Sequence, residues 1–552
     1  MQKITGSLVD FHTKQIYPVC IEISDDGNIT RIHKDMSIIA LSFPEAKKIP
    51  YIMCGFIDSH STVESSFLSP AEYARVALSQ GVIGAVTDFH EIVQILGYKG
   101  YELLKQNTKN IPFYFSTGAP SREAEGLYSL SDIEKLLKRP DISHLGELRD
   151  FPSVILGDTK ELLKISYAQK EHKPCDGCAP GLSAIHIREL YGRGITTDSR
   201  CISAMDAEEK AAIGLKVQLA LNDAEEGIKD YVPLINRYDD RLMFCSESES
   251  CFRMTKGYIR SAVRNAVKQG ADIFSVLRCA CSNPVEHYGM KSGLLREGDS
   301  ADFIMVNNLE DFSVLRVYIK GTCIFSNDGP AQLPEPFPQT LQVLNVFCAQ
   351  PLHTDSILVR AQHSIEKVNV ISCSDGEACT MHKKIIMNAH GGYIRGEPDI
   401  DCLKLVYYSR YSSFAPRTAF VQGFGLKEGA LAVSVSHDEH NIIAFGVSDC
   451  DIVSAVNRVI ALEGGIVFTL NGEVITEAPL SVAGIISNEP AEKVIDKIGK
   501  IKTALLLSGC TLERPVTTLS NCALTSVPVL KISEGGLFDV ASQEEISLFC
   551  SV

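Results

Sequence analysis

Short apolar segments alternate with amphipathic helical segments through the first half of the chain. The strand-like segments cover residues 53–57, 81–88, 112–118, 144–148, 173–178, 194–199, 216–221 and 241–247. Helical patterns separate several of them, for example at 159–170 and 206–215. Strands that alternate with helices are typical of parallel sheets with crossover connections. Eight such units within residues 53–295 predict a (β/α)8, TIM-like barrel.

Alternating apolar and polar residues, the pattern of β-strands, flank the predicted barrel on both sides. Residues 1–52 show this alternation and carry a turn signal at Asp25, Asp26 and Gly27. Residues 296–333 show it again. Because the two flanks share one pattern, we expect residues 1–52 plus 296–333 to form a small composite β-sandwich.

A further unit begins after Pro334-Glu335-Pro336. Residues 337–552 mix strand-like segments with helical ones, such as 449–462, and predict a C-terminal α+β domain. The expected fold class is therefore α/β, with a barrel, a β-sandwich built from both flanks and a C-terminal α+β domain.

Composition excludes several classes of function. The 552 residues are 45% hydrophobic and 22% charged, which is usual for a globular protein of several domains. The net charge of −15 argues against a surface for nucleic acid or for anionic membranes. The 18 cysteines are scattered, and the N-terminus shows no apolar segment of signal-peptide length. We therefore expect a cytoplasmic protein with reduced thiols and a small molecule as its partner.

The first strand of the predicted barrel ends in a polar cluster of Asp58, His60 and Glu64. Barrel enzymes build their active sites at the carboxyl ends of the strands. The phrase Gly-Phe-Ile-Asp-Ser-His at 55–60 resembles the opening motif of amidohydrolases, and of adenine deaminases most closely. The resemblance extends to Gly-Asp-Ser-Ala-Asp at 298–302 and to phrases at 423–427 and 437–441, so it spans essentially the whole chain.

The resemblance implies an activity and a cofactor. Adenine deaminases hydrolyse adenine to hypoxanthine and ammonia, and the family binds divalent metal ions, which here would be manganese, iron or zinc. It also implies a homo-oligomer. In the family the metal ligands come from the ends of strands 1, 4, 5, 6 and 8, because one loop cannot surround two ions.

Several family ligands are replaced in this chain. His60 stands at the position of the first histidine and Glu147 at that of the bridging glutamate. Thr62 replaces the second histidine, Cys178 replaces the histidine of strand 5, and Ser199 replaces that of strand 6. The number of histidines around the metals thus falls from four to one.

Two further positions, one after strand 8 and one after strand 6, depart from the family as well. Glu247 stands where the family has an aspartate that binds metal and moves a proton, and Arg200 stands where it has a glutamate. The fixed charge of Arg200 would oppose a divalent cation. The resulting candidates are His60, Glu147 and Cys178 as metal ligands and Glu247 and Glu64 as catalytic residues.

Structural roles compete with each of these assignments. His60, Glu64 and His90 are equally expected as hydrogen-bonded polar groups that close the mouth of the barrel. Arg200 is a possible partner for Glu147, with a salt bridge in place of the metals. Cys175 and Cys178 form a Cys-x-x-Cys pair without a matching second pair, which favours inert thiols.

Three hypotheses about function follow. The first is an adenine deaminase with a single-metal site, and the second is a catalytically silent homologue (a pseudoenzyme) that binds purines or regulates a partner. The third is a hydrolase with a changed substrate, since the segments at 120–125 and 220–223 also differ from the family. Because lost ligands usually abolish metal affinity, the sequence favours lost or severely impaired activity, with a site that binds little or no metal.

Overall fold

The computed structural model describes residues 2–34, 49–220, 225–329, 333–412 and 414–550. The chain divides into two compact units, one of residues 1–93 and 97–340 and the other of residues 94–96 and 341–552. The three domain boundaries predicted from the sequence stay predictions. Of residues 220–223, which differ from the family, only Ala220 belongs to the described residues.

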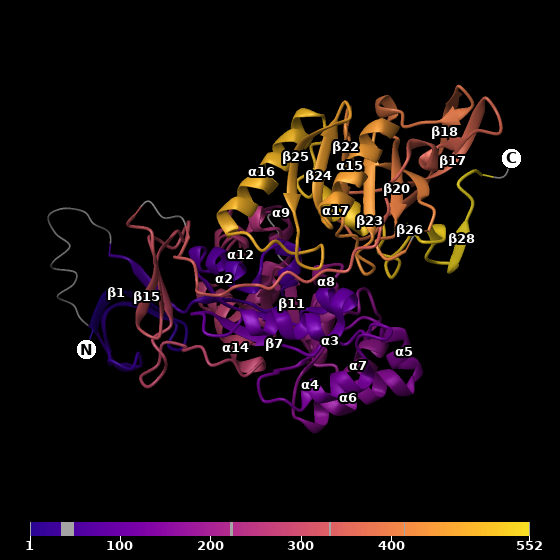
Figure 1. Cartoon of the computed structure of the whole chain (residues 1–552). Helices are drawn as coiled ribbons and strands as arrows, with labels where there is room; N and C mark the ends of the chain where they lie inside the picture. The colour runs from indigo at the N-terminus through magenta and orange to yellow at the C-terminus, as the bar shows by residue number, and fades with distance from the viewer. Residues whose placement is uncertain (1, 35–48, 221–224, 330–332, 413, 551–552) are drawn as a thin grey trace. The chain divides into compact units, whose positions relative to one another are not determined.

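The first unit contains one seven-stranded sheet that joins the two flanks of the barrel. Its order is β15-β14-β13-β4-β1-β2-β3. The strands are β1 (Gln2–Asp10), β2 (Gln15–Ile23), β3 (Ile29–Lys34), β4 (Tyr51–Met53), β13 (Phe303–Val306), β14 (Val314–Ile319) and β15 (Thr322–Ser326). Figure 1 shows β1 and β15 of this sheet close together, although they come from distant parts of the chain. The strand β4 is the link, because it pairs with β1 on one side and with β13 on the other.

The opening strand of the barrel starts later than the sequence predicted. We expected one strand from Met53 to Ile57, but Met53 ends β4 in the flanking sheet, and the barrel strand is β5 (Phe56–Asp58). Gly55 lies between them, and a Cβ there would come within 2.5 Å of the Ile83 side chain. The close packing explains why the chain leaves one sheet and enters the other at a glycine.

Eight parallel strands form the barrel, which confirms the expected fold class. They are β5, β6 (Val82–Thr87), β7 (Tyr114–Thr117), β8 (Leu145–Leu148), β9 (Cys175–Gly177), β10 (Thr197–Asp198), β11 (Lys216–Ala220) and β12 (Leu242–Cys245). Strands β5 to β7 and β8 to β12 pair in chain order. Parallel bridges between Ala119 and Leu145 and between Ser61 and Glu247 close the ring. The carboxyl ends of all eight strands therefore meet at one mouth.

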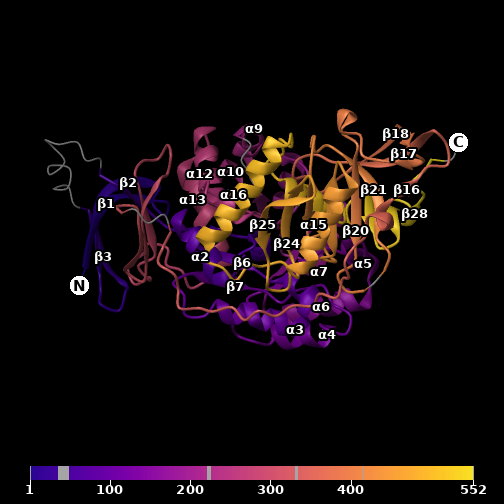
Figure 2. The ribbon, with the colours of Figure 1, turned by 45° about the horizontal axis from the view of Figure 1, so that its top comes forward.

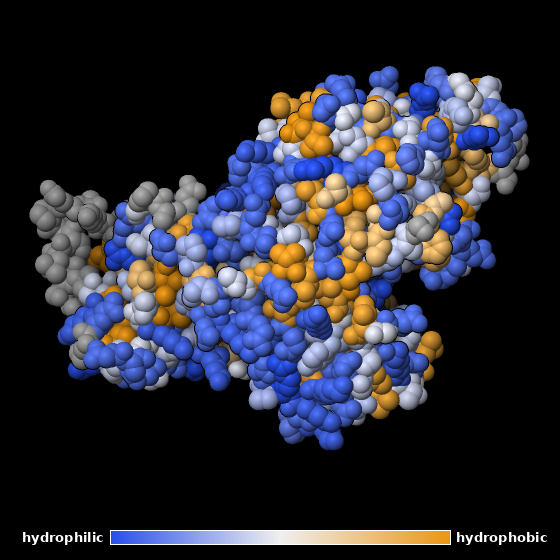
Figure 3. Space-filling model, viewed as in Figure 1, coloured by the Kyte–Doolittle hydropathy of each residue, from blue (hydrophilic) through white to orange (hydrophobic). Residues whose placement is uncertain are grey.

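Helices cover the outside of the barrel (Figure 2). They are α2 (Pro70–Ser79), α3 (His90–Asn107), α4 (Leu130–Leu137), α5 (Phe151–Leu156), α6 (Thr159–Lys170), α7 (Ala184–Arg193), α8 (Ala204–Ile213), α9 (Glu225–Ile228), α10 (Val232–Arg237), α11 (Cys251–Met254), α12 (Tyr258–Lys268), α13 (Ile273–Leu277) and α14 (Asn283–His287). Helix α2 begins with Ser69 accepting a hydrogen bond from the Glu72 amide and with Pro70 in the first turn. The amphipathic α4 buries Ile133, and the surface over α3, α4 and α6 is mainly hydrophilic (Figure 3).

The second unit is built on a ten-stranded sheet with the order β16-β19-β18-β17-β21-β20-β23-β22-β24-β25. Its strands are β16 (Val359–Arg360), β17 (Ile365–Ser372), β18 (Met381–His390), β19 (Tyr393–Ile394), β20 (Leu403–Tyr408), β21 (Arg417–Gln422), β22 (Ala430–Val433), β23 (Ile442–Gly446), β24 (Gly465–Leu470) and β25 (Glu473–Pro479). Helix α15 (Asp449–Ala461) packs against β22, β23 and β24, and α16 (Ala491–Leu507) against β25. A short helix α17 (Pro515–Asn521) and a small sheet of β26 (Leu530–Ser533), β27 (Gly536–Asp539) and β28 (Glu544–Ile546) complete this α+β unit.

Among the described residues, no helix is long and apolar enough to cross a membrane.

The contact that holds the two flanks together makes one stability prediction. Gly27 has a φ of +84°, and a Cβ there would lie 2.3 Å from the Lys320 carbonyl oxygen of the opposite flank. Gly27→Ala should therefore lower the free energy of unfolding by about 3 kcal/mol, from left-handed strain plus a backbone clash.

Gly270→Ala is the matched control, because Gly270 has a φ of +96° and nothing within 4 Å of the added methyl group. It should cost about 1 kcal/mol. Urea unfolding followed by circular dichroism measures both variants, and equal losses would show that the contact between the flanks is unimportant.

Candidate functional site

The mouth of the barrel brings the predicted residues together. His60 follows β5, Glu147 lies in β8, Cys178 follows β9, Ser199 follows β10 and Glu247 follows β12. Parallel strands of a closed barrel end on the same face, so residues far apart in sequence become neighbours there. The five strand ends that the sequence analysis singled out thus lie at one mouth of the barrel.

Glu147 is the centre of this cluster. Its Oε1 accepts a hydrogen bond from Ser199 Oγ and lies 3.8 Å from His60 Nε2, and its Oε2 accepts one from Arg149 Nε at 2.5 Å. Burial alone would raise the pKa of Glu147, but the charges of Arg149 and His60 outweigh burial and hold it well below its usual range. Glu147 is therefore a carboxylate whose two oxygens are both engaged by neighbouring side chains.

Glu247 is also paired with an arginine. Arg200 Nη2 forms a salt bridge with Glu247 Oε1, and this neighbour raises the pKa of Arg200 further. The sequence suggested a bond from Arg200 to Glu147. The structure corrects this, because Arg149 supplies the nearest guanidinium to Glu147 and Arg200 turns to the last strand.

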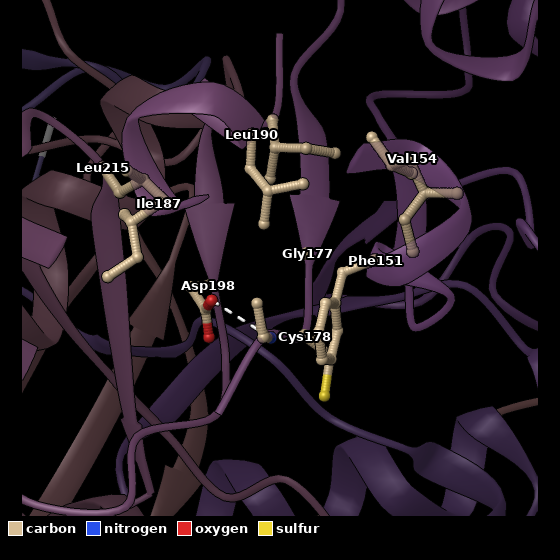
Figure 4. A pocket seen from close by; sticks show the side chains of 11 residues that line it. Phe151, Val154, Gly177, Cys178, Ile187, Leu190, Asp198 and Leu215 are labelled. Carbon is tan, nitrogen blue, oxygen red and sulfur yellow. Dashed lines mark hydrogen bonds between the residues drawn. The ribbon is translucent and has the colours of Figure 1, made fainter. Parts of the chain in front are cut away.

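Cys178 has the environment of an inert thiol. Burial, with a contribution from the charge of Glu147, raises its pKa well above the ordinary value. Figure 4 shows the side chains of Val154, Ile187 and Leu190 around a cavity beside it, which measures only about 10 Å³. That volume holds at most one water molecule.

Asp58 has a structural role that ties the first strand to the last. It accepts hydrogen bonds from the Ser246 amide at 2.9 Å, from Ser246 Oγ at 2.5 Å and from the Tyr73 hydroxyl at 3.2 Å. Burial raises its pKa to about 6. These contacts reinforce the bridge that closes the barrel.

Glu64 and His90 lie in a second polar cluster at the mouth. The Glu64 carboxyl is buried, which raises its pKa to about 7, and its Oε1 accepts a hydrogen bond from the Ile92 amide at 3.4 Å. His90 lies between Asp88, at 2.6 Å, and Glu91, at 3.3 Å. Burial alone would lower the pKa of His90. The charge of Asp88, the nearer carboxylate, outweighs burial and raises this pKa well above its ordinary value.

Lys210 is a site residue that the sequence did not reveal. Its ammonium group is completely buried and lies 3.2 Å from Asp198 Oδ1, 3.3 Å from Asp206 Oδ2 and 2.6 Å from the Arg200 carbonyl oxygen. It therefore fixes the end of β10 and the segment that carries Arg200. The spacing of Asp206 and Lys210 along one helix was visible in the sequence, but their contact with β10 depends on the closed barrel.

Arg149 was also missed, although the sequence held a signal for it. Glu147 and Arg149 are two residues apart at a strand end, and side chains two apart on a strand point to the same face. A buried carboxylate needs a compensating charge, so the nearest arginine on that face was the natural candidate.

The residues at the mouth do not fit the two-metal centre of an amidohydrolase. Within the described residues, no group of three or more histidine, cysteine, aspartate or glutamate side chains is arranged to hold a metal ion. The carboxylates that would bind metal, Glu147 and Glu247, are engaged by Arg149, Ser199 and Arg200 instead. We derive no chemical step through a metal at this site.

The remaining motif residues lie elsewhere. Cys175 is in β9 and fully buried, so the Cys-x-x-Cys pair shows no exposed dithiol. His437 and His440 belong to no helix or strand, and His440 has a φ of +51°. The second unit thus places this pair of histidines in a turn.

The buried ammonium of Lys210 predicts a strong effect on stability. Lys210→Met keeps the length of the side chain but leaves the carboxylates of Asp198 and Asp206 buried without it, so the free energy of unfolding should fall by about 3 to 5 kcal/mol. Lys170→Met, at the exposed end of α6, is the control and should change it by less than about 0.5 kcal/mol. Urea unfolding compares the two variants, and a neutral Lys210→Met would refute the role assigned to the ammonium.

Two family models match parts of this chain. An amidohydrolase family model matches residues 174–324, and a model of the adenine deaminase C-terminal domain matches residues 377–544. Among solved structures, the N-acetyl-D-glucosamine-6-phosphate deacetylase from Mycobacterium smegmatis covers 59% of this chain and 100% of its own, with 14% identity and a TM-score of 0.45.

Curated relatives match the chain over its full length. An adenine deaminase of Salinibacter ruber is 37% identical over 99% of this chain and 98% of its own. An adenine deaminase of Methanosarcina mazei is 33% identical over 100% of both. With similarity of this extent and with the barrel in place, the chain belongs to the adenine deaminase family of the amidohydrolases.

Proposed function

We propose that this chain is an adenine deaminase homologue whose hydrolytic activity is lost or strongly reduced, and which keeps a purine-binding barrel. One observation carries the proposal. Both oxygens of Glu147 accept hydrogen bonds from protein side chains, one from Ser199 and one from Arg149. A carboxylate that bridges two metal ions must offer its oxygens to the metals instead.

The electrostatics of the mouth support the same conclusion. Arg149 and Arg200 bring two permanent positive charges to the carboxylates that would otherwise attract metal ions. Deamination of a purine ring needs a water molecule activated to hydroxide and a group that carries its proton to the leaving ammonia. Glu247 would carry that proton in the family scheme, but here its carboxylate is paired with Arg200.

Adenine is the ligand that the relatives suggest. The curated relatives at 33–37% identity are called adenine deaminases, which supports a purine as the molecule recognised here. We keep a homo-oligomer and a cytoplasmic location as parts of the proposal. All 18 cysteines are free thiols, as expected in a reducing compartment.

An active single-metal hydrolase, on adenine or on another substrate, is the competing proposal. It would rely on His60, Glu147 and Cys178 as ligands, with Glu247 or Glu64 as the proton carrier. The engaged oxygens of Glu147 count against it.

Metal analysis and turnover separate these proposals. Protein purified in the presence of manganese, iron or zinc should hold less than about 0.1 ion per chain, because too few ligands remain. Adenine turnover, followed by its ultraviolet change, should be at least about 10³-fold below that of a relative with the complete ligand set. Adenine binding measured by calorimetry should persist, and an occupied metal site with rapid turnover would refute the proposal.

Restoring the family's metal ligands tests whether their replacement is the cause of the proposed loss of metal binding. A variant with Thr62→His, Cys178→His, Ser199→His and Glu247→Asp should regain metal if the missing donors are the obstacle. Adding Arg200→Glu, the family residue at that position, should increase metal content further, because it removes a repelling charge. If metal returns while turnover does not, the altered segment 120–125 limits catalysis.

A further inference from the structure

A pocket of about 860 Å³ lies at the opposite end of the barrel from the candidate site. Its walls come from α3 and β7, from residues 140–143 before β8, from residues 288–291 after α14, and from turns of the seven-stranded sheet. All of these segments belong to the first compact unit. Catalytic sites of such barrels lie at the carboxyl ends of the strands, so this pocket is separate from the site described above.

Strand register explains why the barrel opens here. The first residues of β7, Tyr114 to Ser116, pair with β6. Backbone hydrogen bonding between β7 and the segment before β8 begins where Thr117 accepts a hydrogen bond from the Ser143 amide, and a bridge follows at Ala119. The lower part of β7 therefore faces the pocket instead of a neighbouring strand.

The pocket contains a buried ammonium group whose charge is only partly compensated. Lys105 is 6% exposed, and its Nζ donates hydrogen bonds to Thr117 Oγ1 and, at 3.0 Å, to the Asp141 carbonyl oxygen. The Asp141 carboxylate lies 3.7 Å away, but it already receives two hydrogen bonds from Arg139, at 3.0 and 2.9 Å. Two cations thus share one carboxylate, and burial lowers the pKa of Lys105 to about 8.

Two further lysines line the pocket in an otherwise acidic protein. Lys291 and Lys320 are exposed, and within the described part of the chain neither forms an ion pair. Asp26 is the second carboxylate of the lining, and it accepts hydrogen bonds from Ser24 and Asn28. The lining thus carries three ammonium groups against two carboxylates, whereas the chain as a whole has a net charge of −15.

The pocket also has an aromatic wall. Phe113 and Phe115 line the pocket with ring centroids 4.7 Å apart, and Met290 is also in the lining. Hydroxyl groups of Ser116 and Ser143 add polar contacts at the same wall. An aromatic surface next to ammonium groups suits a ligand with a planar ring and an anionic end.

We propose that this pocket binds a nucleoside monophosphate, with the phosphate among Lys105, Lys291 and Lys320 and the base against Phe115. Its volume lies within the roughly 300–1,000 Å³ typical of small-molecule sites. The site is separate from the candidate active site, since His60, Glu147, Ser199 and Glu247 do not line it. The inference does not rest on the proposed loss of deaminase activity, because none of the residues that would hold the monophosphate lies at the barrel mouth.

Calorimetry on the full chain tests the proposal with adenosine monophosphate, adenosine and inorganic phosphate as three separate probes. The monophosphate should bind at least about tenfold more tightly than either of the others, because only it uses both the ammonium groups and the aromatic wall. Its affinity should also fall as salt concentration rises.

A double variant that reverses the charge of two lysines tests whether the monophosphate binds in this pocket. Lys291→Glu with Lys320→Glu changes two exposed residues, so the fold should survive, and monophosphate affinity should fall at least about tenfold. Lys170→Glu with Lys229→Glu makes the same change in net charge on exposed positions outside the pocket and should leave affinity unchanged. Circular dichroism checks that both variants are folded.

Three outcomes would overturn the proposal. If adenosine binds as tightly as the monophosphate, the phosphate contributes nothing, and the purine binds at the barrel mouth. If inorganic phosphate binds as tightly, the pocket is a simple oxyanion site. If the control pair weakens binding as much as the pocket pair, the attraction comes from net charge alone.

Discussion

The need to compensate a buried carboxylate governs the mouth of this barrel. Closing eight strands into a ring forces Glu147 into a place where water cannot solvate its charge. In a metal-dependent amidohydrolase, cations bound at the mouth would provide the compensation. Here the guanidinium of Arg149 and the hydroxyl of Ser199 provide it from within the protein. We propose that the scaffold and its charged centre are preserved while the source of positive charge has changed.

A second carboxylate at the mouth is also paired with an arginine. Glu247 at the end of the last strand pairs with Arg200 from the end of β10, so Glu147 and Glu247 each have their own arginine. Lys210 holds the segment before Arg200 through Asp198. Because these contacts support one another, a metal ion would have to displace several of them at once.

Much of this fold could be predicted from the sequence. The alternation of strand-like and helical segments indicated all eight barrel strands, and the strand ends at His60, Glu147 and Glu247 were placed together correctly. The first strand was misplaced, because one apolar segment serves two sheets and only a close contact at Gly55 separates them. Pattern alone carries no information about such a contact.

The partners of the charged groups were harder to predict. Arg200 was matched to Glu147, while the structure pairs it with Glu247, since side-chain direction at a strand end depends on the barrel's stagger. The pocket beneath β7 could not be predicted either, because it arises from the register between β7 and β8. Sequence reasoning therefore identified which residues meet, and geometry decided which of them pair.

A crystal structure of the protein grown in millimolar manganese or zinc tests the central claim most directly. The account predicts Arg149 in contact with Glu147 and Arg200 in contact with Glu247, without metal density between the strand ends. Two well-ordered cations bound by Glu147 and His60, with the arginines turned away into solvent, would contradict it.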